Sequence, residues 1–299
     1  MSTTSTTAAT TAATTAATTA DLASKAPAVV SPTAESTLPS VARMPDPIAG
    51  ERPTADVPFR RLMGVELRKM FNTRAGRWLL IAIGAIIATT LVIMFFNESG
   101  HHRFEDYLTA TVTPSAILLP VAGILAVTSE WSQRTGLVTF ALEPRRSRVS
   151  WAKFLAAMLV GVAAFVLSLA LAAVAHQAAI TIQGYGGDWA LDNNTLLGAV
   201  LFVLLGVAQG VGFGMLLRNT PAAIVLYFVL PTAWAILGEM VSWLDTASSW
   251  LDLNRTMNAL FMVESMTGEQ WAQLGTSVGL WVALPVAVGM WLLRRAEVK

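Results

Sequence analysis

The segment RLMGVELRKMFNTRAGRWLLIAIGAIIATTLVIMFF, residues 61–96, joins a short basic stretch to an uninterrupted hydrophobic run. The run from Trp78 to Phe96 contains no charged residue. Its length is close to the roughly 20 apolar residues that a helix needs to cross the ~30 Å hydrocarbon core of a bilayer. Basic residues stand directly before it, which is typical of the cytoplasmic side of membrane proteins. The segment therefore predicts a transmembrane helix that starts in the cytoplasm.

The same pattern continues along the chain. Further hydrophobic runs of spanning length cover Tyr107–Thr128, Phe154–Ala179, Leu196–Leu217, Pro221–Trp243 and Leu274–Leu293. Lys and Arg crowd into every second connector, as Arg60, Arg61, Arg68, Lys69, Arg74 and Arg77, then Arg134, Arg145, Arg146, Arg148 and Lys153, then Arg218, then Arg294, Arg295 and Lys299. The connectors between these hold only Arg103 and Arg255. This alternation predicts an all-α polytopic protein of the cell membrane with six transmembrane helices and both termini cytoplasmic.

The composition supports the same class. Hydrophobic residues make up 54% of the chain and charged residues 13%, which is more apolar than an ordinary soluble domain. The formal net charge of +1 gives no reason to expect a nucleic-acid partner. The chain has no cysteine, so disulfides and thiolate metal sites are excluded. His101 and His102 are adjacent and do not share a helix face, so we expect no metal site there.

Three regions follow from these patterns. Residues 1–56 are rich in Thr, Ala and Pro and lack apolar periodicity, which predicts a disordered cytoplasmic tail. Residues 57–77 include an amphipathic stretch that places Arg61 and Arg68 opposite an apolar face and carries Lys69 near its end. They predict an interfacial helix in the headgroup plane, and a simple orienting charge cluster is the alternative. Residues 78–299 form the six-span domain.

The connector between the second and third spans is the most patterned inner loop. It begins Ser129-Glu130-Trp131-Ser132-Gln133-Arg134-Thr135-Gly136. Glu130 and Arg134 are four residues apart, in the favourable order for a helical ion pair worth ~0.2–0.5 kcal/mol, and Gly136 can end a short helix. A helix held below the bilayer would offer a contact surface to a cytoplasmic partner. A loop that only fixes topology is the alternative.

These segments together resemble the permeases of the type-two ABC export family, especially its actinobacterial members. The likeness is carried by Glu66-Leu67-Arg68-Lys69, Thr128 to Gly136, Pro144-Arg145-Arg146-Ser147-Arg148 and Ala152-Lys153, and it covers about Arg60 to Lys299. It implies that residues 78–299 are a six-span permease domain that pairs with a second permease copy or a homologous permease. It also implies a coupling helix that docks on a separate ABC ATPase subunit, which we place on Glu130, Trp131, Gln133, Arg134, Thr135 and Gly136.

The resemblance implies further features. Short extracellular helices precede the last span in that family, and the connector from Leu244 to Gln273 is apolar enough to fold against the membrane surface. The chain has no Gly-x-x-x-x-Gly-Lys-Ser/Thr loop for nucleotide phosphates. We therefore expect this chain to be neither the ATPase nor another enzyme, to bind no cofactor, and to leave ATP and magnesium to the partner subunit.

The expected function is the membrane-spanning subunit of an ATP-driven exporter, in contact with membrane lipid. Replacing Glu130 or Arg134 is then expected to uncouple ATP hydrolysis from export. A non-transporting protein of the same fold, such as an immunity or sensory subunit, is the alternative. An intramembrane enzyme is disfavoured because the chain contains no His-Glu-x-x-His motif.

Two polar residues within the spans are candidates for the transport pathway or for packing. Gln209 lies nearer the middle of the fourth span, where we expect it to bond a neighbouring helix. Glu239 lies ~6 Å from Trp243 at ~1.5 Å per residue, where a carboxylate costs less than at the bilayer centre. A vestibule or headgroup position is favoured for it over a substrate or proton site. The stretch Gly206-x-x-x-Gly210-x-x-x-Gly214 predicts close helix packing, within the chain rather than between subunits.

Overall fold

The structure of the protein, a computed structural model, describes residues 57–97, 102–133, 139, 143, 145–261 and 266–295. Within these ranges the secondary structure is helical, without strands. The predicted disordered tail, residues 1–56, lies outside the described residues.

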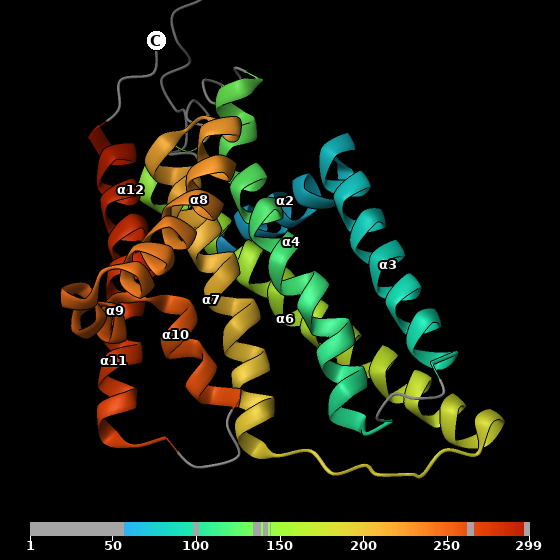
Figure 1. Ribbon diagram of the computed structural model, residues 1–299. Coiled ribbons are helices and arrows are strands. Elements are labelled where there is room, and N and C mark those ends of the chain that lie inside the picture. The colour runs from blue at the N-terminus through green and yellow to red at the C-terminus, as the bar shows by residue number, and fades with distance from the viewer. Residues whose placement is uncertain are drawn as a thin grey trace, which may run out of the picture. The chain divides into compact units, whose positions relative to one another are not determined.

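Six helices of the described residues are long and apolar enough to cross a membrane (Figure 1). They are α3 (Arg74–Phe95), α4 (Phe104–Ser132), α6 (Arg146–Ala178) continued by η1 (Ala179–Gln183), α7 (Asn193–Leu217), α8 (Thr220–Met240), and the run of α11 (Gly268–Val278), η4 (Gly279–Ala283) and α12 (Leu284–Arg295). The six predicted spans are thus confirmed as helices. Two of them extend well past the predicted ends at the polar loop between α4 and α6.

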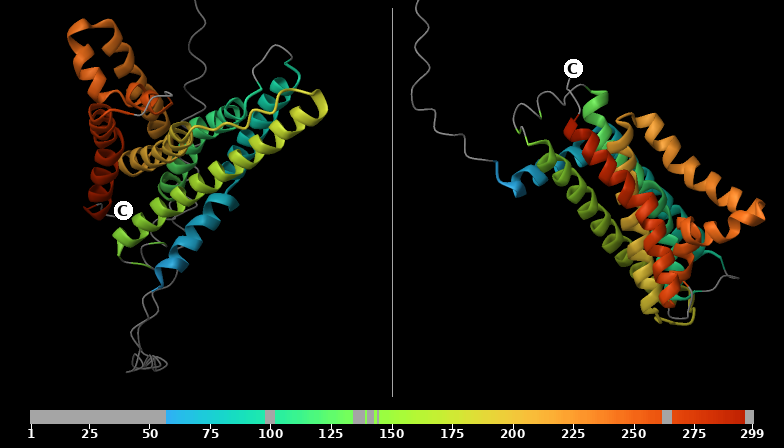
Figure 2. Two further views of the ribbon diagram at one scale, coloured as in Figure 1. Left: turned by 90° about the horizontal axis from the view of Figure 1, so that it is seen from below. Right: turned by 90° about the vertical axis from the view of Figure 1, so that its left-hand side faces the viewer.

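A separate helix, α2 (Phe59–Asn72), precedes α3. The chain leaves the helical conformation at Thr73, and the Thr73 hydroxyl then accepts a hydrogen bond from the Gly76 amide at 3.1 Å, which caps α3. Leu62 of α2 packs on Val149 and Ala152 of α6, and Figure 2 shows the two helices side by side. A helix is therefore present where the sequence predicts the interfacial helix, while its amphipathic role at the membrane surface stays a prediction.

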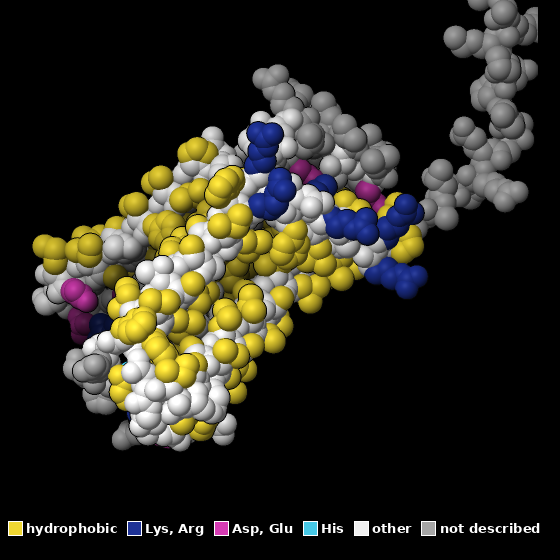
Figure 3. All heavy atoms as spheres, turned by 90° about the vertical axis from the view of Figure 1, so that its right-hand side faces the viewer, with side chains coloured by type: hydrophobic (Ala, Val, Ile, Leu, Met, Phe, Trp, Pro, Cys, Tyr) yellow, Lys and Arg dark blue, Asp and Glu magenta, His cyan; other side chains and the backbone are white. Residues whose placement is uncertain are grey.

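The central helices are α4 and α7. In each of them 56% of the most apolar window is buried, against 11% in α3 and in α8. Hydrophobic side chains cover the outward face around α3 (Figure 3), and Ile81, Ile86 and Ile93 are among its exposed residues. These outer faces suit contact with lipid tails, because apolar surface at that depth meets no water.

The glycines of the fourth span allow α7 to lie close against α4. A Cβ added at Gly206 would lie 3.2 Å from Pro120 Cγ, and one at Gly214 would lie 3.2 Å from Ile124 Cα. A Cβ at Gly210 would collide with the Pro120 carbonyl oxygen. The prediction that this glycine stripe serves packing within the chain is confirmed, since all three positions face α4.

Short helices fill the connector before the last span. They are η2 (Ser242–Leu244), α9 (Asp245–Leu251), α10 (Leu253–Asn258) and η3 (Ala259–Phe261). Met257 and Leu260 pack with Leu274 against α7, and the Trp281 indole N–H donates to the Leu251 carbonyl at 2.6 Å. The predicted fold of this connector against the membrane surface stays a prediction. In the structure this part of the connector packs against the helices of the bundle. Paired polar groups permit this, since Thr256 and Ser277 meet at 2.6 Å.

Helices whose ends carry basic residues contact one another at one end of the bundle. Arg148 donates to the Val57 carbonyl at 2.6 Å, and Arg146 at the start of α6 donates to the Leu293 carbonyl of α12 at 3.5 Å. We call this end, formed by α2, the start of α6 and the last turns of α4, α7 and α12, the basic end. Connectors that are rich in Lys and Arg in the sequence thus lie at the same end of the bundle. The cytoplasmic location of this end stays a prediction.

The opposite end carries the connectors with few basic residues. Arg103 Nε lies 3.1 Å from Asp188 Oδ2, and the Asp192 amide donates to Glu105 at 3.0 Å. His102, one of the two adjacent histidines, stacks on the Tyr185 ring with 3.6 Å between centroids, and His101 lies outside the described residues. These contacts hold the α6–α7 connector against the start of α4.

Candidate functional site at the basic end

Four charged side chains from three helices meet at the basic end. Lys69 Nζ of α2 lies 2.8 Å from Glu66 Oε1 and 2.7 Å from Glu130 Oε1 of α4. Lys153 Nζ of α6 lies 2.6 Å from Glu66 Oε2 and 2.9 Å from Glu130 Oε1. The signs alternate, so each carboxylate touches both ammonium groups. We refer to these four residues as the four-charge cluster.

Helix geometry places each member of the cluster. Leu62 and Glu66 are four residues apart on α2, so both fall on the face that α6 covers. Glu130 lies in the last turn of α4, which continues to Ser132 and so passes the predicted end of the span. Lys153 lies in the first turns of α6, which begins eight residues before the predicted span. The extra turns of both helices are what bring the charges together.

Three of the four charged side chains in the cluster are buried, so each of them needs a partner of opposite charge. Glu66, Glu130 and Lys153 are 3%, 6% and 4% exposed, whereas the Lys69 side chain is 40% exposed. Charges removed from water are tolerated only when they are paired and hydrogen-bonded. Burial opposes the charged form of Lys69, but hydrogen bonds to Glu130 and Glu66 outweigh it and raise the Lys69 pKa. Lys69 therefore keeps its charge at neutral pH.

The loop that follows α4 also reaches the cluster. The Thr139 hydroxyl donates to Glu130 Oε1 at 3.1 Å. Four residues further on, Glu143 pairs with Arg148 of α6 at 3.1 Å. The cluster thus connects α2, α4, α6 and the loop between the last two.

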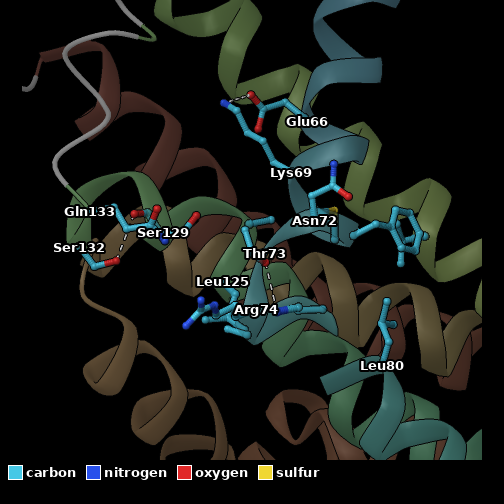
Figure 4. Close-up of a pocket in the computed structure, with 17 residues that line it drawn as sticks. Glu66, Lys69, Asn72, Thr73, Arg74, Leu80, Leu125, Ser129, Ser132 and Gln133 are labelled. Atoms are coloured by element: carbon cyan, nitrogen blue, oxygen red, sulfur yellow. Dashed lines mark hydrogen bonds and ion pairs between the residues drawn. The ribbon is translucent and has the colours of Figure 1, made fainter. Parts of the chain in front are cut away.

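Two cavities flank the four-charge cluster. The first, of about 610 Å³, lies between the α2–α3 junction and the end of α4. Figure 4 shows Ser129, Ser132 and Gln133 on one side of it and Asn72 and Thr73 on the other. The second, of about 640 Å³, is lined by Val57, Arg61, Leu62, Val65, Glu66, Lys69, Thr73, Ser129, Glu130, Gln133, Thr139 and Glu143. Glu66 and Lys69 of the cluster line both cavities, and Glu130 lines the second.

The structure separates the predicted coupling residues into distinct environments. Glu130 is buried in the cluster, whereas Gln133 is exposed and lines both cavities. Trp131 is half-buried, with the Arg218 guanidinium 5.2 Å from its ring centroid. Arg134, Thr135 and Gly136 lie outside the described residues, so the predicted Glu130–Arg134 ion pair stays a prediction. Among the described residues, the ion-pair partners of Glu130 are Lys69 and Lys153.

The basic residues of α2 also divide. Arg61 and Arg68 are exposed, as the amphipathic pattern predicts, while Lys69 turns into the cluster. Glu66 and Lys153 lie within the segments that carry the family resemblance, but the sequence predicted no contact for either of them. The signal for both was a charge on the side of its helix that packs against a neighbour, but that side is known only once the helices are placed.

The two polar candidates in the spans lie elsewhere. Gln209 is 4% exposed and lines a cavity of about 200 Å³. Its amide nitrogen has no hydrogen-bond partner in the described part of the chain, so the predicted bond from this atom to a neighbouring helix is not found. Glu239 is exposed, one residue before the end of α8, which agrees with the favoured headgroup or vestibule position.

Comparison with known proteins adds no assignment. No protein-family model matches the chain, and no curated protein matches it. Membership of the ABC export family is therefore a proposal, which depends on the sequence segments and on the site at the basic end.

Proposed function

We propose that this chain is the permease subunit of an ATP-driven ABC exporter in the cell membrane, with both termini in the cytoplasm. The observation that supports this most directly is the four-charge cluster, which lies where the α4–α6 loop leaves α4 and enters α6. A separate ATPase subunit, which carries ATP and magnesium, would bind this loop and drive the movement of the spans.

A motor that acts on a loop needs a stiff connection from that loop to the membrane helices. Glu130 and Lys153 lie on either side of the loop and touch at 2.9 Å, and both also touch a residue of α2. Separating α4 from α6 here would leave buried charges unpaired, at a cost of about 3–5 kcal/mol. The ends of the two helices are therefore expected to move as one unit with α2.

The exposed residues around the cluster provide the surface for the partner. Gln133 at the end of α4 and Arg61 on α2 both line the cavity of about 640 Å³ on the loop side. Little of the surface of α3 and α8 is buried by the rest of the chain. Their exposed faces are therefore available to lipid and to a second permease copy. A pair of such subunits with two ATPases would complete the exporter.

Gln133→Arg tests the proposed docking surface. The full chain would be affinity-purified from membranes of its own host, and co-purifying proteins would be identified by mass spectrometry with ATPase activity measured in parallel. Gln133 is exposed and has no role in the cluster, so this change should leave the fold intact. We expect about tenfold less co-purified ATPase, which corresponds to a loss of ~1.4 kcal/mol at the interface.

Gln177→Arg is the matched control, because Gln177 is exposed near the opposite end of α6. It should recover as much ATPase as the unchanged chain. Recovery of no protein with a phosphate-binding loop would contradict the exporter proposal and favour a non-transporting protein of the same fold. Equal losses in both variants would contradict docking at the basic end.

A further inference from the structure

Gln209 is a buried hydrogen-bond donor without a partner. At ~1.5 Å per residue it lies ~24 Å from the start of α7 and ~12 Å from its end, well inside the bundle. Its amide nitrogen is buried and bonds to no group of the described residues. A buried amide in that state is costly, so its environment suits a partner from outside the described part of the chain.

The side chain lines a cavity of about 200 Å³ between α4, α7, α8 and α10. A neighbouring cavity of about 250 Å³ shares Phe202, Asn254 and Met257 with it. The two cavities therefore adjoin, and we treat them as two lobes of one site, which we call the Gln209 site. The inner lobe is the cavity of about 200 Å³ that Gln209 lines.

The lining defines the chemistry of an occupant. Every described residue that lines either lobe is uncharged, so an ion would find no counter-charge. Ile117 of α4 is 46% exposed and Phe228 of α8 is 38% exposed, and both line the inner lobe. The lobe therefore opens between α4 and α8 on faces that suit lipid contact, which gives access from the bilayer.

We propose that the Gln209 site binds an uncharged, membrane-soluble molecule that presents a hydrogen-bond acceptor, such as a carbonyl oxygen, to the Gln209 amide. The apolar body of the ligand packs on Phe202 and Met257. That this ligand is also the transported substrate rests on the exporter proposal above, whereas its binding does not.

Benzophenone is a suitable probe, because it is a neutral aromatic ketone that attaches to nearby C–H bonds when irradiated. The purified full chain in lipid nanodiscs would be irradiated with it, and adducts would be mapped by mass spectrometry. Met257, which is 3% exposed and lines both lobes, should be labelled more strongly than Met240, which is 77% exposed and reports labelling from the lipid.

Gln209→Leu should reduce labelling of Met257 about three- to tenfold, as loss of one hydrogen bond implies. Gln177→Leu, a matched change at an exposed position, should leave it unchanged. Ile117→Trp fills the inner lobe from its exposed rim and should also reduce it, so this variant decides the question if Gln209→Leu does not fold. Labelling of Met257 that does not exceed that of Met240, or that persists in a folded Gln209→Leu variant, would overturn the proposal.

Failure of this proposal is distinguishable from failure of the exporter proposal. Recovery of the ATPase depends on the basic end and should be the same in the Gln209→Leu variant as in the unchanged chain. If the chain binds benzophenone through Gln209 but recovers no ATPase, the ligand site is supported. Only the proposal that its ligand is a transported substrate is then rejected.

Discussion

Lys153 Nζ lies 2.6 Å from Glu66 Oε2, and this contact joins two residues that are 87 positions apart in the chain. Both side chains are almost completely buried, at 5% and 3% exposed. The contact makes α2 part of the bundle, because a buried charge depends on its partner in a way that an exposed charge does not.

Lys153→Met removes one cation from two buried carboxylates. We expect it to lower the free energy of unfolding by about 3–5 kcal/mol, measured by SDS titration in mixed micelles. Arg255→Met is the control, since Arg255 and Asp245 form an exposed pair at 2.7 Å that should contribute ~1 kcal/mol or less. Similar losses in the two variants would show that the cluster does not have the stabilising role assigned to it.

Glu130→Ala should also destabilise the chain, because it leaves Lys153 with one carboxylate instead of two. This changes the design of any coupling experiment. The sequence alone suggested Glu130 as a residue whose replacement disturbs only the motor contact, whereas its burial links that contact to folding. Loss of ATPase recovery in Glu130→Ala with an unchanged free energy of unfolding would contradict this reading.

Gly210→Leu would force α7 away from α4, since a side chain there collides with the Pro120 carbonyl. Overpacking of this kind costs about 1–3 kcal/mol, to be measured by the same titration. Gly84→Leu on α3 has open space around its Cβ and should change the free energy by less than ~0.5 kcal/mol. A Gly210→Leu chain that keeps full stability would contradict the expected cost of overpacking between α7 and α4.

Single cysteines can test the orientation, because the natural chain has none. Gly186 is exposed in the α6–α7 connector with open space at its Cβ, and Arg68 is exposed on α2. In intact cells a membrane-impermeant maleimide should label Gly186→Cys, and it should label Arg68→Cys only after the membrane is opened. The reverse result would place the basic end outside the cell.

The Asp188 carboxylate gives a pH-dependent prediction. Two hydrogen bonds lower the Asp188 pKa. The larger effect comes from the Ala190 amide at 3.0 Å and the smaller from Arg103 at 3.1 Å. A lowered pKa contributes stability above the unfolded value of about 3.9 and loses it as pH falls through the folded value. The stability gap between the natural chain and Asp188→Asn should therefore be wider near pH ~6 than near pH ~3. An equal gap at both would show that the charge of Asp188 contributes nothing.

Hydropathy predicted the positions of all six spans because an apolar run of this length has few other stable environments. It placed the ends of α4 and α6 less well. Ser129 to Ser132 and Arg146 to Lys153 are rich in polar residues, so a hydropathy pattern leaves both segments out of the spans. In the structure they remain helical and pack against α2.

The candidate site was harder to predict for a related reason. A helical pattern can suggest a partner four residues away, as it did for Glu130 and Arg134. It cannot suggest Lys69 or Lys153, whose distance from Glu130 depends on how three helices pack. Gln209 was recognised as unusual from its depth alone, while its unpartnered nitrogen and the adjoining lobes required the arrangement of α4, α7, α8 and α10.

The four-charge cluster also has a consequence for biosynthesis. A chain that emerges from its N-terminus presents Glu66 and Lys69 first, then Glu130, and Lys153 only at the start of the third span. Until that span arrives, two carboxylates share one ammonium group. We therefore expect the end of α4 to reach its final buried position only once α6 has formed, because Glu130 lacks one of its two ammonium partners until then.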